Sequence, residues 1–157
     1  MGRGVAGRSP GGSDGAPMIQ FFVAGHVGPQ GSKSYKGHRG GKPVLVESSG
    51  RVKPWRAAVV AEALRHASEL LTGPVGVHAE FILPRPKSAS AKAVISAARQ
   101  IGDTDKLCRS TLDALSNVIY RDDCQVVDLR ASKRVALPGE TPGAHITITT
   151  VTEGASQ

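Results

Sequence analysis

The chain has 157 residues, enough for one domain, and 39% of them are hydrophobic, enough for an ordinary core. Lys and Arg number 20 against 13 Asp and Glu, and the resulting formal charge of +7 favours a polyanionic partner. No apolar run approaches the roughly 18 residues of a membrane span, so we expect no membrane partner. Cys108 and Cys124 lack the spacing of a Cys/His metal site, and we expect both to be reduced in a cytoplasmic protein.

The first third of the chain alternates between glycine-rich segments with few apolar residues and short apolar, β-prone segments. Residues 1–17 are rich in Gly, Ser, Pro and Arg, which predicts a disordered N-terminal extension before a domain over 18–157. Residues 18–24 are β-prone and predict the first strand. The glycine-rich stretch 25–42 predicts a long mobile loop, and 43–46 a short strand.

The remaining segments predict alternating helices and strands. Apolar residues at helical spacing predict a helix over 54–71, and period-two alternation predicts a half-buried strand over 75–83. A short helix over 91–99 is possible in a basic, Ala- and Ser-rich segment, and a long helix is predicted over 106–116. Strands are then predicted over 124–134 and 145–151. This order predicts an α+β fold, a small mixed β-sheet with two main helices packed on one face in a single domain.

Six of the seven aspartates lie between positions 103 and 128. Asp is a poor helix former and a poor strand former, so this concentration costs stability unless something binds there. Carboxylate oxygens are the ligands that Mg²⁺ prefers. In a chain of formal charge +7, the cluster suggests a divalent-metal site that faces a polyanion.

Spacing separates these aspartates into different roles. Asp103 and Asp105 share a face only in extended chain, which Gly102 favours, although Asp105 could instead act as a helix N-cap. Asp123 follows the helix and turn that return the chain to the start of the cluster. Its neighbour Asp122 is interpreted either as an ordinary turn residue or as part of the site.

The other aspartates of the cluster are not candidate metal ligands. Asp113 lies roughly 12 Å along the helix axis from Asp105, too far to share an ion, and is predicted to pair with Arg109 four residues before it. Asp128 is predicted to be solvated. Arg109 is interpreted either as this helix partner or as a cation near a reacting phosphate. The candidate Mg²⁺ ligands are therefore Asp103, Asp105 and Asp123.

A basic window between positions 33 and 56 carries seven cations against Glu47, a net charge of +6. Glycines between the cations would let this segment mould to a phosphate backbone. Tyr35 and Trp55 could stack on exposed bases, although Trp55 is also a natural core anchor for the first helix. The candidate DNA-binding residues are Lys33, Lys36, Arg39, Lys42, Arg51, Lys53 and Arg56, with Lys133 extending the same surface.

The ordered motifs of residues 102–133 together resemble those of the RusA-type Holliday junction resolvases, whose pattern runs PDxDNLxK, then DAL, then DDxQV and a later Lys. The matching residues here are Asp103-Thr104-Asp105-Lys106-Leu107-Cys108-Arg109, then Asp113-Ala114-Leu115, then Asp122-Asp123-Cys124-Gln125-Val126, then Lys133. The earlier segments Pro29-Gln30-Gly31-Ser32-Lys33 and Val52-Lys53-Pro54-Trp55 look like the family's substrate-side loop and first helix.

The resemblance implies a phage- or bacterium-encoded endodeoxyribonuclease of DNA recombination and repair. It implies a Mg²⁺-dependent homodimer, without an organic cofactor, that binds four-way DNA junctions and nicks two opposed strands symmetrically. By motif position, Asp103, Asp105 and Asp123 would be catalytic metal ligands, and Arg109 takes the place of the family's lysine.

The chain departs from the family pattern at Gly102, where the family has Pro, at Lys106, where it has Asn, and at Arg109. Arg keeps the charge of Lys but not its geometry. Two alternative functions stay open. One is another metal-dependent nuclease or phosphate-transfer enzyme, and the other is a non-catalytic, basic DNA-binding accessory protein.

Overall fold

The fold is seen in a computed structural model, which describes residues 18–31, 33–47, 49–88 and 102–153. The main sheet contains, in spatial order, β1 (Met18–Ala24), β6 (Gly143–Thr150), β4 (Val75–Leu83) and β5 (Val126–Val135). β6 pairs antiparallel with both neighbours, whereas β4 and β5 run parallel, so the sheet is mixed as predicted.

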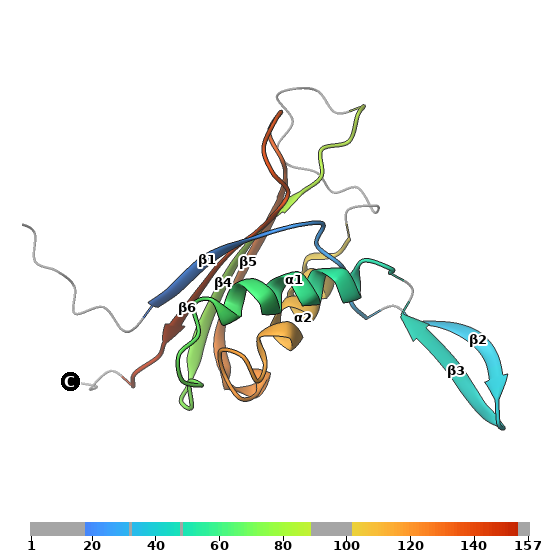
Figure 1. Cartoon of the computed structure of the whole chain (residues 1–157), viewed down its shortest axis with the longest axis horizontal. Coiled ribbons are helices and arrows are strands. Elements are labelled where there is room, and N and C mark those ends of the chain that lie inside the picture. Colours follow the sequence, from blue (N-terminus) through green and yellow to red (C-terminus); the bar gives the residue numbers. More distant parts are fainter. Residues whose placement is uncertain (1–17, 32, 48, 89–101, 154–157) are drawn as a thin grey trace, which may run out of the picture.

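The helices α1 (Val52–Leu64) and α2 (Thr104–Leu115) lie together across one face of this sheet (Figure 1). Alternate residues of β4, among them Val77, Ala79 and Phe81, are buried on that face. The predicted single domain with two main helices on one face of a mixed sheet is confirmed. Within the described part of the chain, neither helix has the length and apolar content needed to cross a membrane.

The predicted loop over 25–42 is wrong in its second half. Lys33–Arg39 forms β2, which pairs antiparallel with β3 (Lys42–Glu47) in a separate two-stranded hairpin. Gly40 and Gly41 connect the strands with φ values of 58° and 75°. Two positive φ values in a two-residue connection are typical of a hairpin turn, and Gly-Gly supplies them without steric cost.

Both helices begin two residues earlier than predicted, and α1 ends at Leu64 rather than near Leu71. Beyond the end of α1, the Leu71 N–H donates to the carbonyl of Ile119 at 2.8 Å. Leu71 is therefore held beside the loop that follows α2 and does not extend the helix. The predicted extension over 1–17 and the possible helix over 91–99 lie outside the described residues.

The end of β5 is joined to the loop before β6 by a bidentate ion pair. Arg134 donates Nη1 to Glu140 Oε2 at 2.7 Å and Nη2 to Oε1 at 2.6 Å. The Leu137 N–H also donates to Glu140 Oε2, at 2.8 Å. These hydrogen bonds, those of Arg134 first, lower the pKa of Glu140 from 4.5 to about 2.

We expect Glu140→Gln to lower the free energy of unfolding at neutral pH but not in strong acid. Because the pKa of Glu140 is lowered by folding, its contribution is complete above pH 4.5 and is lost as the pH falls towards 2. The variant should be less stable than wild type at pH 7, and the difference should shrink below pH 4.5. Urea unfolding at several pH values measures this, with the exposed Glu69→Gln as control. A difference that stays constant down to pH 2 would contradict it.

Candidate active site

The first two candidate carboxylates lie at the start of α2. Asp103 is the N-cap, with extended backbone (φ −79°, ψ 141°), and Asp105 lies in the first helical turn. The N-cap alternative for Asp105 is therefore wrong, and only Asp103 has the extended backbone that was predicted for both. Both carboxylates are exposed near the positive end of the helix. Asp103 Oδ2 also lies 3.3 Å from Lys106 Nζ.

Gly102, which leads into α2, has a conformation that the family's proline could not adopt. Its φ is +90°, whereas proline is restricted to about −65°. A Cβ added at this position would lie 3.2 Å from the ring of Pro29, so the loop containing Pro29 packs closely here. The Gly102 carbonyl accepts a hydrogen bond from Lys133 Nζ at 2.8 Å. Lys133, predicted to contact DNA, therefore contacts the backbone at the entry to α2.

The second acidic segment is a short 3₁₀ helix, η2 (Asp123–Gln125), where continuous strand was predicted. Asp122 caps it by accepting the Cys124 N–H at 2.8 Å, and Gln125 Oε1 accepts the Asp122 N–H at 3.0 Å. Gln125 Nε2 also donates to the Leu71 carbonyl at 2.8 Å, which fixes the turn to the body of the protein. Asp122 is thus a turn residue, as the first of its two interpretations predicted. The Asp123 side chain is exposed.

Asp123 is electrostatically coupled to the later part of α2. Its pKa is raised by partial burial first, then by the neighbouring Asp122 carboxyl and the charge of Asp113, while Arg109 acts in the opposite direction. The pKa of Tyr120 is raised mainly by burial and then by Asp123 and Asp113. The charge of Asp123 therefore interacts with those of Asp113 and Arg109 on α2. Asp105 lies one helical turn before Arg109 on the same helix.

Asp113 is held by a residue that sequence reasoning missed. Gln30 Nε2 donates to Asp113 Oδ2 at 2.5 Å, and the Gln30 N–H donates to the Lys106 carbonyl at 3.0 Å. No ion pair between Asp113 and Arg109 exists among the described residues, so that predicted pair is not formed. Gln30 is 83 positions from Asp113, and no local sequence pattern reports such a contact.

The oxygen atoms exposed at both ends of the acidic cluster are of the kind that bind a hard cation such as Mg²⁺. Asp103, Asp105 and Asp123 offer exposed carboxylate oxygens. Nearby, Gln30 Oε1 is buried and receives no hydrogen bond from the described residues. Across those same residues, no three His, Cys, Asp or Glu side chains are gathered as an ion-holding group. The three carboxylates suit Mg²⁺ by residue type alone, and their joint coordination is a proposal.

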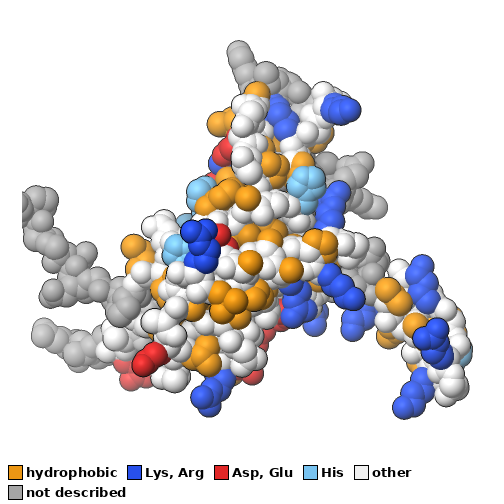
Figure 2. All heavy atoms as spheres, viewed as in Figure 1, with side chains coloured by type: hydrophobic (Ala, Val, Ile, Leu, Met, Phe, Trp, Pro, Cys, Tyr) orange, Lys and Arg blue, Asp and Glu red, His pale blue; other side chains and the backbone are white. Residues whose placement is uncertain are grey.

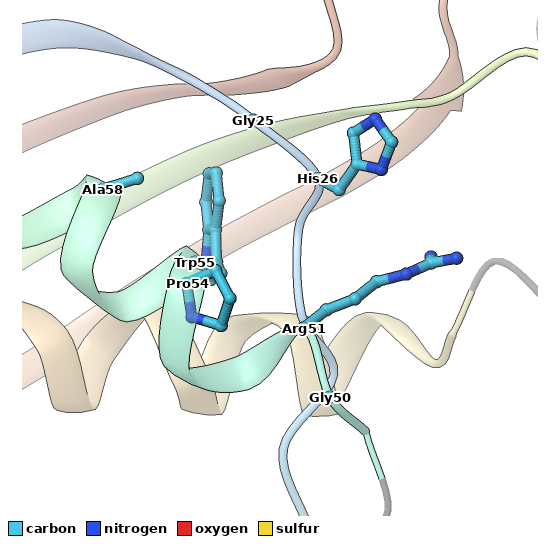
Figure 3. Close-up of a pocket in the computed structure, with 7 residues that line it drawn as sticks. All are labelled: Gly25, His26, Gly50, Arg51, Pro54, Trp55 and Ala58. Atoms are coloured by element: carbon cyan, nitrogen blue, oxygen red, sulfur yellow. The ribbon is translucent and has the colours of Figure 1, made fainter.

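A hollow beside the start of α1 is separate from these carboxylates (Figure 3). It is lined by Gly25, His26, Gly50, Arg51, Pro54, Trp55 and Ala58. Trp55 is only 1% exposed, and its Nε1 donates to Thr111 Oγ1 on α2 at 3.0 Å. The core-anchor interpretation of Trp55 is confirmed.

Most of the predicted DNA-binding cations lie on or beside the hairpin (Figure 2). The exposed ones are Lys33, Lys36, Arg39 and Lys42 on β2 and β3, with Arg51 and Lys53 at the start of α1. Arg56 is half-buried on the same helix. Gly31, just before the hairpin, lies close to Arg109, since a Cβ there would be 3.7 Å from Arg109 Nη1. The basic surface and the carboxylates are therefore linked by one short segment.

The fold and site define a small mixed α/β domain whose exposed carboxylates lie near a basic surface on and beside the hairpin. The sequence model of the family described as Endodeoxyribonuclease RusA matches residues 27–149, and the chain belongs to this family. The family implies endodeoxyribonuclease activity on branched DNA, and its nucleases are metal-dependent. The chain is also 33% identical over 124 residues to a protein of Bacillus subtilis (strain 168), "Uncharacterized protein YqaN", covering 73% of this chain and 86% of that protein.

Proposed function

We propose that the chain is a Mg²⁺-dependent, structure-selective endodeoxyribonuclease that resolves four-way DNA junctions in recombination and repair. The observation that carries the proposal is that the exposed carboxylates of Asp105 and Asp123 adjoin Arg109, next to a basic surface, in a chain of this family. The protein acts as a homodimer, because a two-fold pair of sites matches two opposed strands of a junction. Paired nicks at symmetric positions are the expected products.

Asp103, Asp105 and Asp123 are the proposed ligands of the metal ion. Bound Mg²⁺ would supply a Lewis acid that activates water and neutralises charge on the phosphodiester. Three carboxylates brought close together would repel one another, and a bound cation would offset that repulsion. Lys106, which stands where the family has Asn, engages Asp103 at 3.3 Å and would compete with a cation there.

Arg109 is proposed to contact the reacting phosphate. Its guanidinium stays charged and presents several N–H donors, which suit phosphate oxygens. In this position it would stabilise the charge that develops as the 3′ oxygen leaves. Gln30 and Lys133 are positioning residues, because one holds Asp113 and the other holds the Gly102 carbonyl at the entry to α2.

A synthetic, mobile four-way junction labelled on both strand pairs tests the proposal. We expect paired symmetric nicks in Mg²⁺, none after metal removal with EDTA, and none on a linear duplex of the same sequence. Junction binding that ignores EDTA, with no nick in any branched substrate, would instead identify a DNA-binding accessory protein. Cleavage of other phosphate substrates but not of branched DNA would identify a different phosphate-transfer enzyme.

A further inference from the structure

The β2–β3 hairpin stands out from the body of the protein (Figure 1). None of its described side chains belongs to the hydrophobic core cluster. Among the described strands, β2 and β3 pair only with each other. Tyr35 and Leu45 are each 57% exposed, and Val46 is 45% exposed. A two-stranded hairpin is marginally stable alone in water, and exposed apolar residues mark a binding surface. The hairpin is therefore built to contact a partner.

Charge identifies the partner as a polyanion. Residues 33–47 contain four cations and Glu47, a net charge of +3. Lys33, Lys36, Arg39 and Lys42 are all exposed. The hairpin of a second copy carries the same four cations and would be repelled by this one, whereas a phosphate backbone would be attracted.

The shape of the hairpin suits a groove. Its tip is thin, because Gly40 and Gly41 form the turn and a Cβ at either would meet nothing within 4 Å. Arg39 and Lys42 are paired directly beside this turn. Further along, Tyr35 is paired with Leu45, and the Tyr35 hydroxyl is hydrogen-bonded to His38 Nδ1 at 2.6 Å, which restrains the ring. Cations thus flank the tip, and an apolar pair lies behind it.

We propose that the β2–β3 hairpin binds in the major groove of a duplex arm of the DNA substrate. That groove is about 12 Å wide and admits a two-stranded ribbon. The cations contact phosphates on its two sides, and the Tyr35–Leu45 pair contacts base edges, where thymine methyl groups offer apolar surface. The inference rests on the proposed function for the identity of the substrate, but it applies to any duplex of sufficient length.

The charge component is tested with a triple variant, Lys36→Gln, Arg39→Gln and Lys42→Gln, in the full chain. Its matched control removes three exposed cations elsewhere, Arg65→Gln, Lys87→Gln and Arg130→Gln. Binding to a linear duplex and to a junction is measured in EDTA over a range of salt. Each phosphate contact contributes about 0.9 to the slope of log K for binding against log salt concentration. The magnitude of this slope should fall by about 2 to 3 in the hairpin variant and change little in the control. Equal losses in both variants would overturn the proposal.

The groove itself is tested by dimethyl sulfate, which methylates guanine N7 in the major groove. Wild type should protect guanines within a duplex arm, and Tyr35→Ala and the triple variant should lose that protection, whereas Tyr35→Phe should keep it. Circular dichroism and thermal unfolding check that each variant is folded. Absence of protection, or Tyr35-dependent permanganate reactivity at the branch point, would overturn groove binding in favour of stacking on unpaired bases.

The two proposals fail in different ways. If wild type nicks junctions without protecting guanine N7, groove binding is wrong and the nuclease proposal stands. If wild type protects duplex guanines but nicks no branched DNA, groove binding stands and the nuclease proposal is wrong.

Discussion

Asp105→Asn is expected to bind four-way junctions as wild type does but to fail to cut them. The amide is nearly the same size as the carboxylate and keeps the exposed first turn of α2 intact, while it removes the negative charge proposed to hold Mg²⁺. We expect a fall in cleavage rate of roughly 10²-fold or more, the scale of removing one electrostatic contributor from an active site. Single-turnover cleavage and a gel-shift assay in EDTA measure the two properties separately.

Asp128→Asn is the matched control for this variant. Asp128 is another exposed aspartate of the same cluster. It lies on β5, where its Oδ2 is 3.6 Å from Arg130 Nε. Its replacement should leave both binding and cleavage unchanged. Cleavage by Asp105→Asn at the wild-type rate would show that the metal site is assigned to the wrong residues.

Trp55→Ala is expected to have the largest effect on folding. Trp55 lies on α1 in the hydrophobic core with 1% of its surface exposed, and it donates a hydrogen bond to Thr111 on α2. Truncation of a buried aromatic residue to Ala costs about 3–5 kcal/mol of unfolding free energy. Urea unfolding followed by far-UV circular dichroism measures this loss, because the variant has no Trp for fluorescence.

Tyr35→Ala provides the contrast, since Tyr35 is aromatic but exposed on the hairpin. We expect its unfolding free energy to lie within about 0.5 kcal/mol of wild type. If Trp55→Ala retained wild-type stability and lost DNA binding, Trp55 would be a base-stacking residue and not a core anchor.

Local patterns in the sequence were sufficient for most of the fold. Alternation over Val75–Leu83 predicts a strand with one buried face, because successive side chains point to opposite sides of a sheet. The hairpin turn was also readable, since Gly40-Gly41 between β-capable segments is a hairpin signal that the long-loop interpretation overlooked. The position of Leu71 was not readable, because its N–H donates to the carbonyl of Ile119, 48 positions away.

For the candidate site, the sequence by itself determined which residues are proposed to carry the chemistry. Carboxylates at 103, 105 and 123, with Arg109 four residues after the second, follow from residue type and spacing alone. Only the tertiary structure decided their surroundings. The Asp113 charge acts on Asp123. Gln30 donates a hydrogen bond to Asp113, and Lys133 donates one to the Gly102 carbonyl. Such contacts depend on how distant segments pack, and one-dimensional spacing carries information only about residues on the same element.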